Sequence, residues 1–431
     1  MPAPSPEGSM RRSVDLRQRP DRVGTRLPTL TGLRAIAAGL VFLRHVGGLL
    51  PQGAAQDRWL RVFGVGLDGV SFFFLLSGFV LAWSYRLDDT PRRFYRRRAA
   101  RILPNHLVTW VLAVPVIAWV DGVRPSGPIL ASTLTLTQSW NPSSSHYYGV
   151  NGVEWSLSCE VFFYLLLPLV IGPLCRQRRA RVAAGVLSVA TVMVLPTLLR
   201  PDARVLLGGL PGATWREWAL YNFPVSRLAE FTLGVVLGIA FREGWRPQIS
   251  WRFGASMAAL GVAGSAYLNT SFSITAATLV PFAALMVTGA AADIRSDKTA
   301  LSARIWVRLG EWSFAFYLVH QLVVRVIVHN FAAPTVIRLL VWAPGALVGS
   351  TCLAWALYTC VEHPAERRWR ARRRGSPDLP HNPAQIAVVG VELGHSIEHL
   401  KPRFPEHDFC RSRVDRQHGD PGEAGAVQRF R

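Results

Sequence analysis

Apolar stretches long enough to cross a lipid bilayer recur along the whole chain. A hydrocarbon core about 30 Å thick requires about 20 apolar residues in a helix, and this chain of 431 residues is 50% hydrophobic and only 17% charged. We therefore predict an all-α, polytopic integral membrane protein with about ten transmembrane helices. The predicted spans are 31–50, 62–85, 102–121, 153–172, 180–200, 218–240, 253–269, 274–291, 306–329 and 337–361.

The chain divides into three parts by composition. Residues 1–28 are polar and rich in Pro and Arg, and we predict a disordered cytoplasmic segment. Residues 29–374 contain all the predicted spans and form one transmembrane domain. Residues 375–431 show no sustained hydrophobic period and are predicted to be a polar, disordered cytoplasmic tail.

Neither the cysteines nor the tail predicts a metal site. The five cysteines include no C-x-x-C pair, which favours neither a structural disulfide nor a cysteine-ligated metal. His395, Glu398 and His399 have a spacing that metal ligands can have, but the surrounding composition favours a solvated tail. We predict no bound metal and no bound cofactor.

The charge distribution predicts the orientation in the membrane. The net charge is +21, almost entirely from arginine. With the N-terminus inside, about thirty basic residues fall on the inner side and about six on the outer side, as the positive-inside rule requires. We therefore expect a multi-pass protein of the plasma membrane with cytoplasmic N- and C-termini. Its partner is a lipid bilayer and not nucleic acid.

Arg34 and His45 are ionisable residues inside the first predicted span. Arg34 and His45 are eleven residues apart, about three helical turns, so they project from one face roughly 16 Å apart along the axis. Ionisable groups inside a membrane are costly and usually face a functional interior. This pair predicts chemistry within the membrane.

Two acids lie in other spans at a depth similar to that of His45. Asp68 and Glu160 each lie about two turns below the predicted outer end of their span. Because each would be expensive alone in lipid, we expect the three side chains to converge on one polar centre. His320 and Tyr317, in the ninth span, are further candidates.

Glu230 is a further candidate in the sixth span. It follows Arg227 by three residues, which places both on one helical face and favours a structural ion pair.

Such a polar centre is compatible with two classes of function. A neutral imidazole can take a proton from a hydroxyl, and a carboxylate can hold its other nitrogen, which suits acyl transfer to an alcohol. The same residue types form proton or ion relays in transporters. Ser156 shares a face with Glu160, but a serine nucleophile needs a base close by, and the sequence alone cannot show one.

Arginines also precede the third span. Arg98 and Arg101 are one turn apart, and arginine forks are suited to phosphate groups such as those of a coenzyme A thioester. The alternative is that this basic cluster sets topology and contacts anionic lipid head groups.

Taken together, these segments resemble the acyltransferase-3 family of integral membrane acyltransferases. Six segments carry the resemblance in family order, over about residues 29–370. They are 30–38 with His45 following, 69–79, 98–104, 155–160 with Phe163 and Tyr164, 313–320 and 361–364.

The resemblance implies about ten spans, a cytoplasmic acyl-CoA co-substrate and an acceptor hydroxyl on a sugar or a sugar-bearing molecule. It also implies that Arg34, His45, Arg98, Arg101 and Glu160 are functional positions.

Within the family, the stand-alone domain and the arginine bias look like the actinobacterial branch that acylates macrolide antibiotics at a lactone or deoxysugar hydroxyl. O-acetylation of cell-envelope polysaccharide or glycolipid is the alternative acceptor class. A polytopic exporter without acyltransferase activity is a rival reading, although the chain lacks the paired half-repeats of many transporters.

Overall fold

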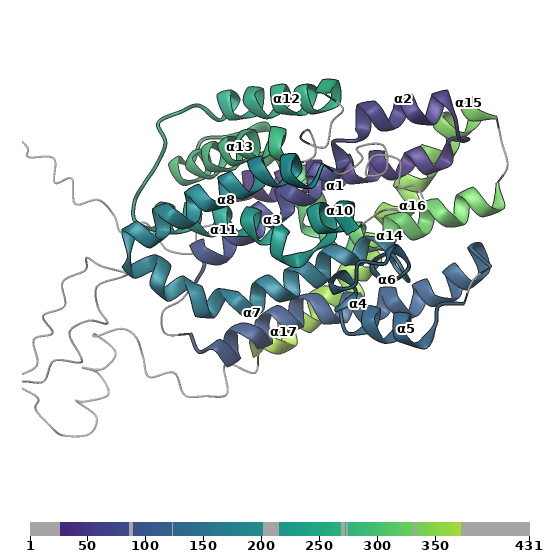
Figure 1. Ribbon diagram of the computed structural model, residues 1–431, viewed down its shortest axis with the longest axis horizontal. Helices are drawn as coiled ribbons and strands as arrows, with labels where there is room; N and C mark the ends of the chain where they lie inside the picture. Colours follow the sequence, from purple (N-terminus) through teal and green to yellow (C-terminus); the bar gives the residue numbers. More distant parts are fainter. Residues whose placement is uncertain are drawn as a thin grey trace, which may run out of the picture.

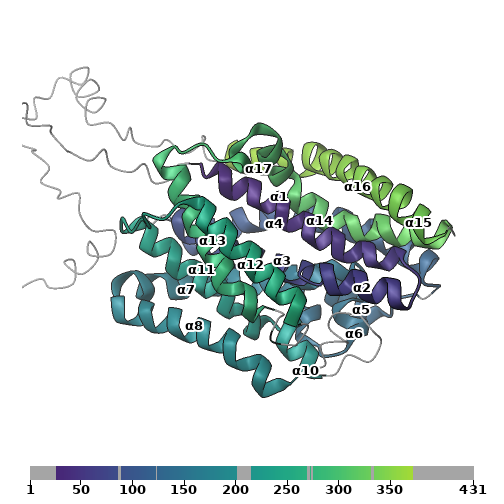
Figure 2. The ribbon, with the colours of Figure 1, turned by 90° about the horizontal axis from the view of Figure 1, so that it is seen from above.

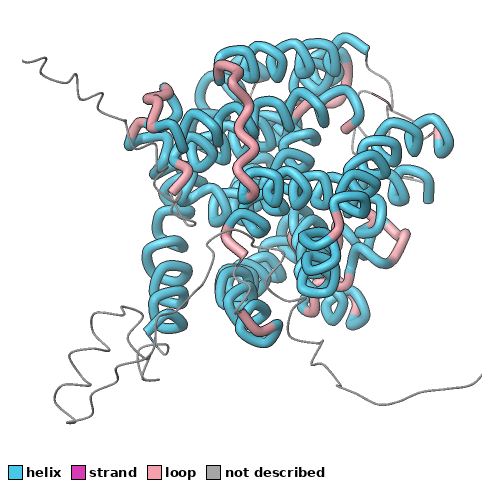
Figure 3. Tube along the Cα trace, turned by 90° about the vertical axis from the view of Figure 1, so that its left-hand side faces the viewer, coloured by secondary structure: helices cyan, strands magenta, loops and turns pink. Residues whose placement is uncertain are grey.

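The computed structural model describes residues 26–85, 89–122, 124–200, 215–268, 272, 275–331 and 334–371. These residues form helices and connecting loops, with no strand among them (Figure 3). The all-α prediction is therefore confirmed. The predicted disordered segments 1–28 and 375–431 lie, apart from residues 26–28, outside the described residues.

The described helices follow the order of the predicted spans (Figure 1). In the first half they are α1 (Pro28–Val46), α2 (Ala54–Phe63), α3 (Gly66–Trp83), α4 (Pro91–Val120), α5 (Gly127–Leu134), α6 (Ser144–Tyr147), α7 (Trp155–Arg176) and α8 (Arg178–Leu199), with the short turns η1 (Gly47–Leu49), η2 (Gln138–Trp140) and η3 (Gly152–Glu154). In the second half they are α10 (Trp215–Glu217), η4 (Trp218–Asn222), α11 (Pro224–Arg242), α12 (Trp251–Leu268), α13 (Ala276–Arg295), η5 (Ala300–Ser302), α14 (Arg304–Asn330), α15 (Thr335–Ile337), η6 (Arg338–Trp342), α16 (Ala343–Leu357), η7 (Tyr358–Glu362) and α17 (His363–Ala371).

Nine helical segments of the described chain are long and apolar enough to cross a membrane. Each overlaps one predicted span. The remaining predicted span, 253–269, corresponds to the helix α12, which has 18 residues but does not belong to the nine.

The directions of neighbouring helices place α12 in the same alternating series. α1 and α14 run parallel, since Gly310 meets Thr31 near the start of both helices and His320 meets His45 further along. Both α3 and α13 run antiparallel to α1, and α11 runs parallel to α3. Because α11 and α13 share one direction, α12 between them has to run the opposite way. Within the described residues, α12 therefore adds a tenth helix to the nine and runs opposite to α11 and α13.

The contacts between α12 and α13 agree with that direction. A Cβ on Gly254 would meet Thr288, towards the end of α13, whereas a Cβ on Gly261 would meet Pro281, nearer its beginning. The two helices are therefore an antiparallel pair, and they lie side by side in both ribbon views (Figures 1 and 2).

α3 lies at the centre of the bundle, in contact with α1, α7, α11 and α13 (Figure 2). Its approach to α11 depends on glycine, because a Cβ on Gly78 would lie 2.1 Å from the carbonyl oxygen of Phe231, and one on Gly234 would lie 2.0 Å from that of Leu75. Small residues at such crossings allow membrane helices to pack backbone to backbone.

The segment 127–154 packs against the ends of α4, α7 and α14. A buried polar network attaches it: Glu154 lies 3.2 Å from Nδ1 of His106 and accepts a hydrogen bond from Thr109. Asn151 donates to Glu154 and to the carbonyl oxygen of Leu318. α5 and α6 of this segment lie at the opposite end of the bundle from α17 (Figure 1).

Candidate active site

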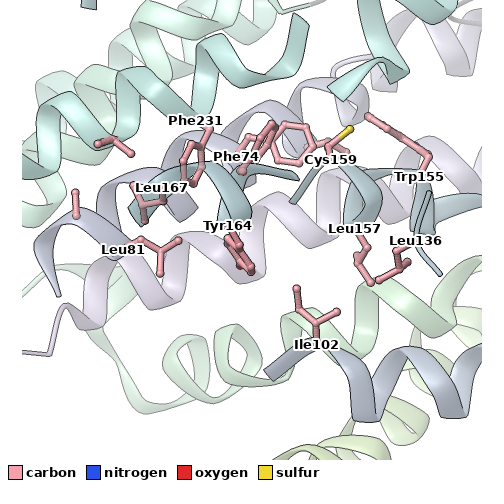
Figure 4. Packing of buried hydrophobic residues seen from close by; sticks show 14 of the residues in the cluster. Phe74, Leu81, Ile102, Leu136, Trp155, Leu157, Cys159, Tyr164, Leu167 and Phe231 are labelled. Atoms are coloured by element: carbon pink, nitrogen blue, oxygen red, sulfur yellow. The ribbon is translucent and has the colours of Figure 1, made fainter. Parts of the chain in front are cut away.

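A cavity of about 170 Å³ lies between α1, α3, α4, α7 and α14. Because three arginines line it, we call it the arginine cavity. Its apolar wall continues into the main core, and Figure 4 shows Leu81, Ile102 and Tyr164 of that wall together with their core neighbours. Its polar lining residues are Arg34, Ser77, Arg98, Arg101, Ser156, Glu160, Tyr164, Ser313 and Tyr317.

Two of the three arginines carry no carboxylate partner among the described residues. No hydrogen bond or ion pair joins Arg34 to the described part of the chain. Arg98 lies over the rings of Phe94 and Tyr164, at 6.0 and 5.9 Å from their centroids, and its buried Nε has no hydrogen-bond partner. The cavity therefore offers two guanidinium groups to an anion.

Arg101 differs, because two carboxylates already hold it. Its Nη1 lies 2.6 Å from Glu362 and 2.5 Å from Glu366, near the start of the helix α17. Asn105 donates a hydrogen bond of 2.6 Å to the other oxygen of Glu362. Arg101 therefore ties α4 to the end of the transmembrane domain, which the sequence analysis did not anticipate.

Glu160 faces the arginine cavity and accepts two hydrogen bonds at the same oxygen. Ser77 of α3 donates from 3.0 Å and Tyr164, one turn along α7, donates from 2.6 Å. The second carboxylate oxygen accepts no hydrogen bond from the described residues.

Tyr317 and Ser156 form the far wall of the arginine cavity. Their hydroxyl groups lie 2.9 Å apart, and both also donate to the carbonyl oxygen of Val153 at 3.0 Å. Neither partner of Ser156 is a base, so the described contacts do not support a serine nucleophile.

A second, more polar pocket of about 280 Å³ lies at the other end of α1. We call it the histidine pocket, because His45 opens into it. The ion pair between Arg325 of α14 and Asp121 at the end of α4, 2.9 Å long, forms one wall. Its remaining polar side chains are Arg44, Gln56 and Gln321.

His45 and His320 lie between the two spaces. Nε2 of His320 is 3.1 Å from Nδ1 of His45, and their ring centroids are 5.0 Å apart. The ring of Tyr317, which lines the arginine cavity, lies 5.9 Å from that of His320. Three adjoining rings therefore connect one space to the other.

The expected convergence of His45, Asp68 and Glu160 on one centre is wrong. Glu160 faces the arginine cavity and His45 the histidine pocket. Asp68 lines neither: it accepts a 2.6 Å hydrogen bond from the backbone N–H of Thr275, at the start of α13, and one from Ser265 of α12. The depth of a residue along its span gives its position along the membrane normal only. These side chains project from their helices in different directions, so residues of similar depth do not meet.

The predicted ion pair between Arg227 and Glu230 is confirmed, with a distance of 3.1 Å between two buried side chains. Arg227 also donates to Ser71 of α3 and lies between the rings of Phe74 and Tyr221, at 5.3 and 5.0 Å. Glu230 lines neither space and is a packing element of the α3–α11 contact.

Two pairings in the site escaped the sequence analysis. The spacing of Glu362 and Glu366 places both acids on one helical face, which was a signal for a cation partner. The contact of His45 with His320 had no local signal, since 275 residues separate the two. Within the described residues no group of three or more His, Cys, Asp or Glu side chains could hold a metal ion.

Comparison with known proteins agrees with the motifs of the sequence. A family model described as an acyltransferase domain matches residues 27–359. The acyltransferase MdmB of Streptomyces mycarofaciens is 38% identical over 317 residues, which are 71% of this chain and 81% of MdmB.

Two further relatives are more distant. The exopolysaccharide production protein ExoZ of Rhizobium meliloti is 28% identical over 74% of this chain and 95% of its own. The O-acetyltransferase OatA of Staphylococcus aureus is 24% identical over 88% of this chain, which spans 63% of OatA. No solved structure matches the chain significantly.

Proposed function

This chain belongs to the acyltransferase-3 family of membrane acyltransferases, and we propose that it moves a short acyl group from acyl-CoA to a hydroxyl of a sugar-bearing acceptor. The observation that carries the proposal is the arrangement of two spaces at opposite ends of α1, with His45 and His320 between them. An acceptor in the histidine pocket can then reach His45 directly, and the acyl end of a donor in the arginine cavity would reach it past Tyr317 and His320.

The arginine cavity is the proposed donor side. Arg34 and Arg98 form no ion pair with a carboxylate among the described residues, so an anion entering there meets two guanidinium groups that no acid holds directly. Phosphates of coenzyme A supply such charge. Arg101 is a weaker candidate for direct contact, because a phosphate would have to compete with Glu362 and Glu366.

The histidine pocket is the proposed acceptor side. Its mixed lining of amide, guanidinium and carboxylate groups suits a molecule rich in hydroxyl groups. His45 takes the proton of the acceptor hydroxyl, whose oxygen bonds to the acyl carbon while the carbon–sulfur bond of the thioester breaks. The proton then passes from His45 to the departing thiolate, so that the products are an ester and free coenzyme A.

Glu160 and Tyr317 have supporting parts in this scheme. Tyr317 lies between the arginine cavity and His320 and would shape the passage of the acyl group. Glu160, held by Ser77 and Tyr164, places a carboxylate beside Arg34 and Arg98 and would orient the donor through them.

We propose a macrolide antibiotic, modified at a lactone or deoxysugar hydroxyl in antibiotic biosynthesis, as the acceptor. The similarity to an acyltransferase of Streptomyces mycarofaciens supports this choice. The exopolysaccharide production protein among the relatives supports the second candidate, O-acetylation of a cell-envelope polysaccharide or glycolipid.

The test uses the full chain in membranes. We propose that the protein lies in the plasma membrane with its acyl-CoA site on the cytoplasmic side. Membranes that contain the protein are incubated with labelled acetyl-, propionyl- or isovaleryl-CoA and a panel of macrolides and glycans, and the products are identified by mass. Acyl-CoA-dependent ester formation is expected with one acceptor class. An exporter would instead change the distribution of the acceptor across the membrane without forming an ester.

A further inference from the structure

The backbone partners of His45 and His320 determine where their protons lie. Nδ1 of His45 lies 2.9 Å from the carbonyl oxygen of Val41, and Nδ1 of His320 lies 3.2 Å from that of Phe316. A carbonyl oxygen only accepts hydrogen bonds, so each of these nitrogens has to carry a proton. When both rings are neutral, the lone pair of each lies at Nε2.

These tautomers give the contact between the two rings a direction. Nε2 of His320 lies 3.1 Å from Nδ1 of His45, so the one Nδ1–H of His45 is shared between the carbonyl oxygen of Val41 and the lone pair of His320. The lone pair at Nε2 of His45 has no hydrogen-bond partner among the described residues, and the ring opens into the histidine pocket. The pair therefore leaves one unbonded basic nitrogen on the acceptor side.

His320 can act only through His45. It is 0% exposed and lines neither the arginine cavity nor the histidine pocket. Its ring stacks on Phe316 at 5.6 Å with an angle of 6° between the planes, and Phe42 and Tyr317 enclose it at 6.3 and 5.9 Å. This packing fixes the direction of its lone pair.

We propose that His320 is the positioning residue of the base. It accepts the Nδ1–H of His45, keeps Nε2 of His45 directed into the histidine pocket, and stabilises the imidazolium that forms when His45 takes the acceptor proton. This inference rests on the proposed function, in which His45 is the base. His320 stays neutral throughout, because the proton from the hydroxyl enters and leaves at Nε2 of His45.

The role is the one that a carboxylate fills in the Ser-His-Asp arrangement. Here no carboxylate is hydrogen bonded to His45 in the described part of the chain. The charged groups that face His45 are Arg44 on its own helix, Arg325 on α14 and Asp121 at the end of α4, and Arg325 and Asp121 pair with each other. With two cations nearby, the groups hydrogen bonded to Nδ1 of His45 that favour a proton on the ring are the carbonyl oxygen of Val41 and the lone pair of His320.

Substitutions at position 320 separate positioning from packing. In His320→Gln, the amide oxygen can take the position of Nε2 and accept the Nδ1–H of His45. In His320→Asn, the shorter side chain places its amide at the position of Nδ1 instead. His320→Phe keeps an aromatic ring but has no hydrogen-bond acceptor. We expect kcat to fall at least ~10-fold in the Asn and Phe variants, with the KM values for donor and acceptor nearly unchanged, and to recover in part in the Gln variant.

The pH profile gives a second readout that packing alone would not change. His320→Glu places a carboxylate next to His45, which favours the imidazolium, so the acid limb of the kcat profile should move to higher pH by about one unit. His329→Gln is the matched control, because His329 is an exposed histidine at the far end of the same helix. It should keep the activity and profile of the original chain.

A chemical probe separates failure of this inference from failure of the proposed function. Diethyl pyrocarbonate modifies unprotonated imidazole, and mass spectrometry of the His45 peptide measures the reaction without any substrate. We expect His45 to react through its open nitrogen, with the pH midpoint of the reaction raised in His320→Glu.

The outcomes decide between the two claims. If the Asn, Phe and Gln variants lose activity equally, or if neither kcat nor the reactivity of His45 changes, the positioning role is refuted. If the original chain forms no ester while these reactivity shifts appear, the proposed function fails and the His45–His320 arrangement stands.

Discussion

At the residue scale, His45 has one nitrogen bonded inside the helix bundle and the other open to a polar pocket. That arrangement is suited to a general base, whose contribution is typically about 10²–10⁴-fold. We therefore predict that His45→Ala lowers turnover at least ~10²-fold while the protein still inserts and accumulates. Activity near that of the original chain in a normally inserted variant would remove His45 from the mechanism.

Substitutions of the three arginines of the arginine cavity should have different effects, because the arginines have different partners. Contacts to a part of the donor that does not change in the reaction affect KM more than kcat. Arg34→Ala and Arg98→Ala should raise the KM for acyl-CoA, and lysine should rescue only in part because a point charge cannot replace the fork.

Arg101→Ala is the contrasting variant. It leaves Glu362 buried without its cation, so we expect a lower melting temperature and less folded protein. Steady-state kinetics and thermal unfolding in detergent measure both effects. An increase in donor KM for Arg101→Ala alone, with unchanged stability, would return Arg101 to the phosphate-binding role that the sequence first indicated.

The candidate residues were visible in the sequence, but their partners were not. Arg34 and His45 are conspicuous because an apolar span has no ordinary place for them. The predicted carboxylate partner of His45 is replaced by His320, and the predicted phosphate ligand Arg101 is held by acids. Which side chains pair between helices depends on how each helix is rotated about its own axis. The boundaries of the spans give no information about that rotation.

At the element scale, the contact between α3 and α11 shapes the wall behind the arginine cavity. Gly234→Ala would force its Cβ against the backbone of Leu75, where a neighbouring side chain cannot move to make room. Overpacking of this kind typically costs about 1–3 kcal/mol. We predict a lower melting temperature for this variant.

Gly172→Ala in α7 is the matched control, because a Cβ there meets nothing within 4 Å. Its melting temperature should stay within error of that of the original chain. Equal effects of the two substitutions would mean that glycine matters here through helix propensity and not through the close approach.

The positions of the helices followed from hydropathy in nine cases, because the lipid-facing side chains have to be apolar. α12 is the informative exception. Its pairing with α13 and the direction of α11 show that it runs through the bundle, although its composition does not place it among the nine. Packing against another helix determines this element more than its own hydropathy does.

At the scale of the whole molecule, we predict ten alternating helices, which would bring both ends of the bundle to one side of the membrane. If α12 crosses the membrane, positions at its two ends become accessible from opposite faces. We predict this for single cysteines at Ile249 and Tyr267, which are 47% and 91% exposed, in a background without the native cysteines. Impermeant maleimide on sealed cells should label position 267 and not position 249. Labelling of both from one face would contradict ten crossings.

The central claim is that a donor on one side of the membrane acylates an acceptor that enters from the other. Acyl-CoA does not cross a sealed bilayer, so vesicles of defined orientation, with labelled acyl-CoA on one side and acceptor on the other, test it most directly. We predict labelled ester only when acyl-CoA is on the side of α17 and Arg98, and none in His45→Ala vesicles. Equal product with acyl-CoA confined to the opposite side, or none from either, would contradict the account.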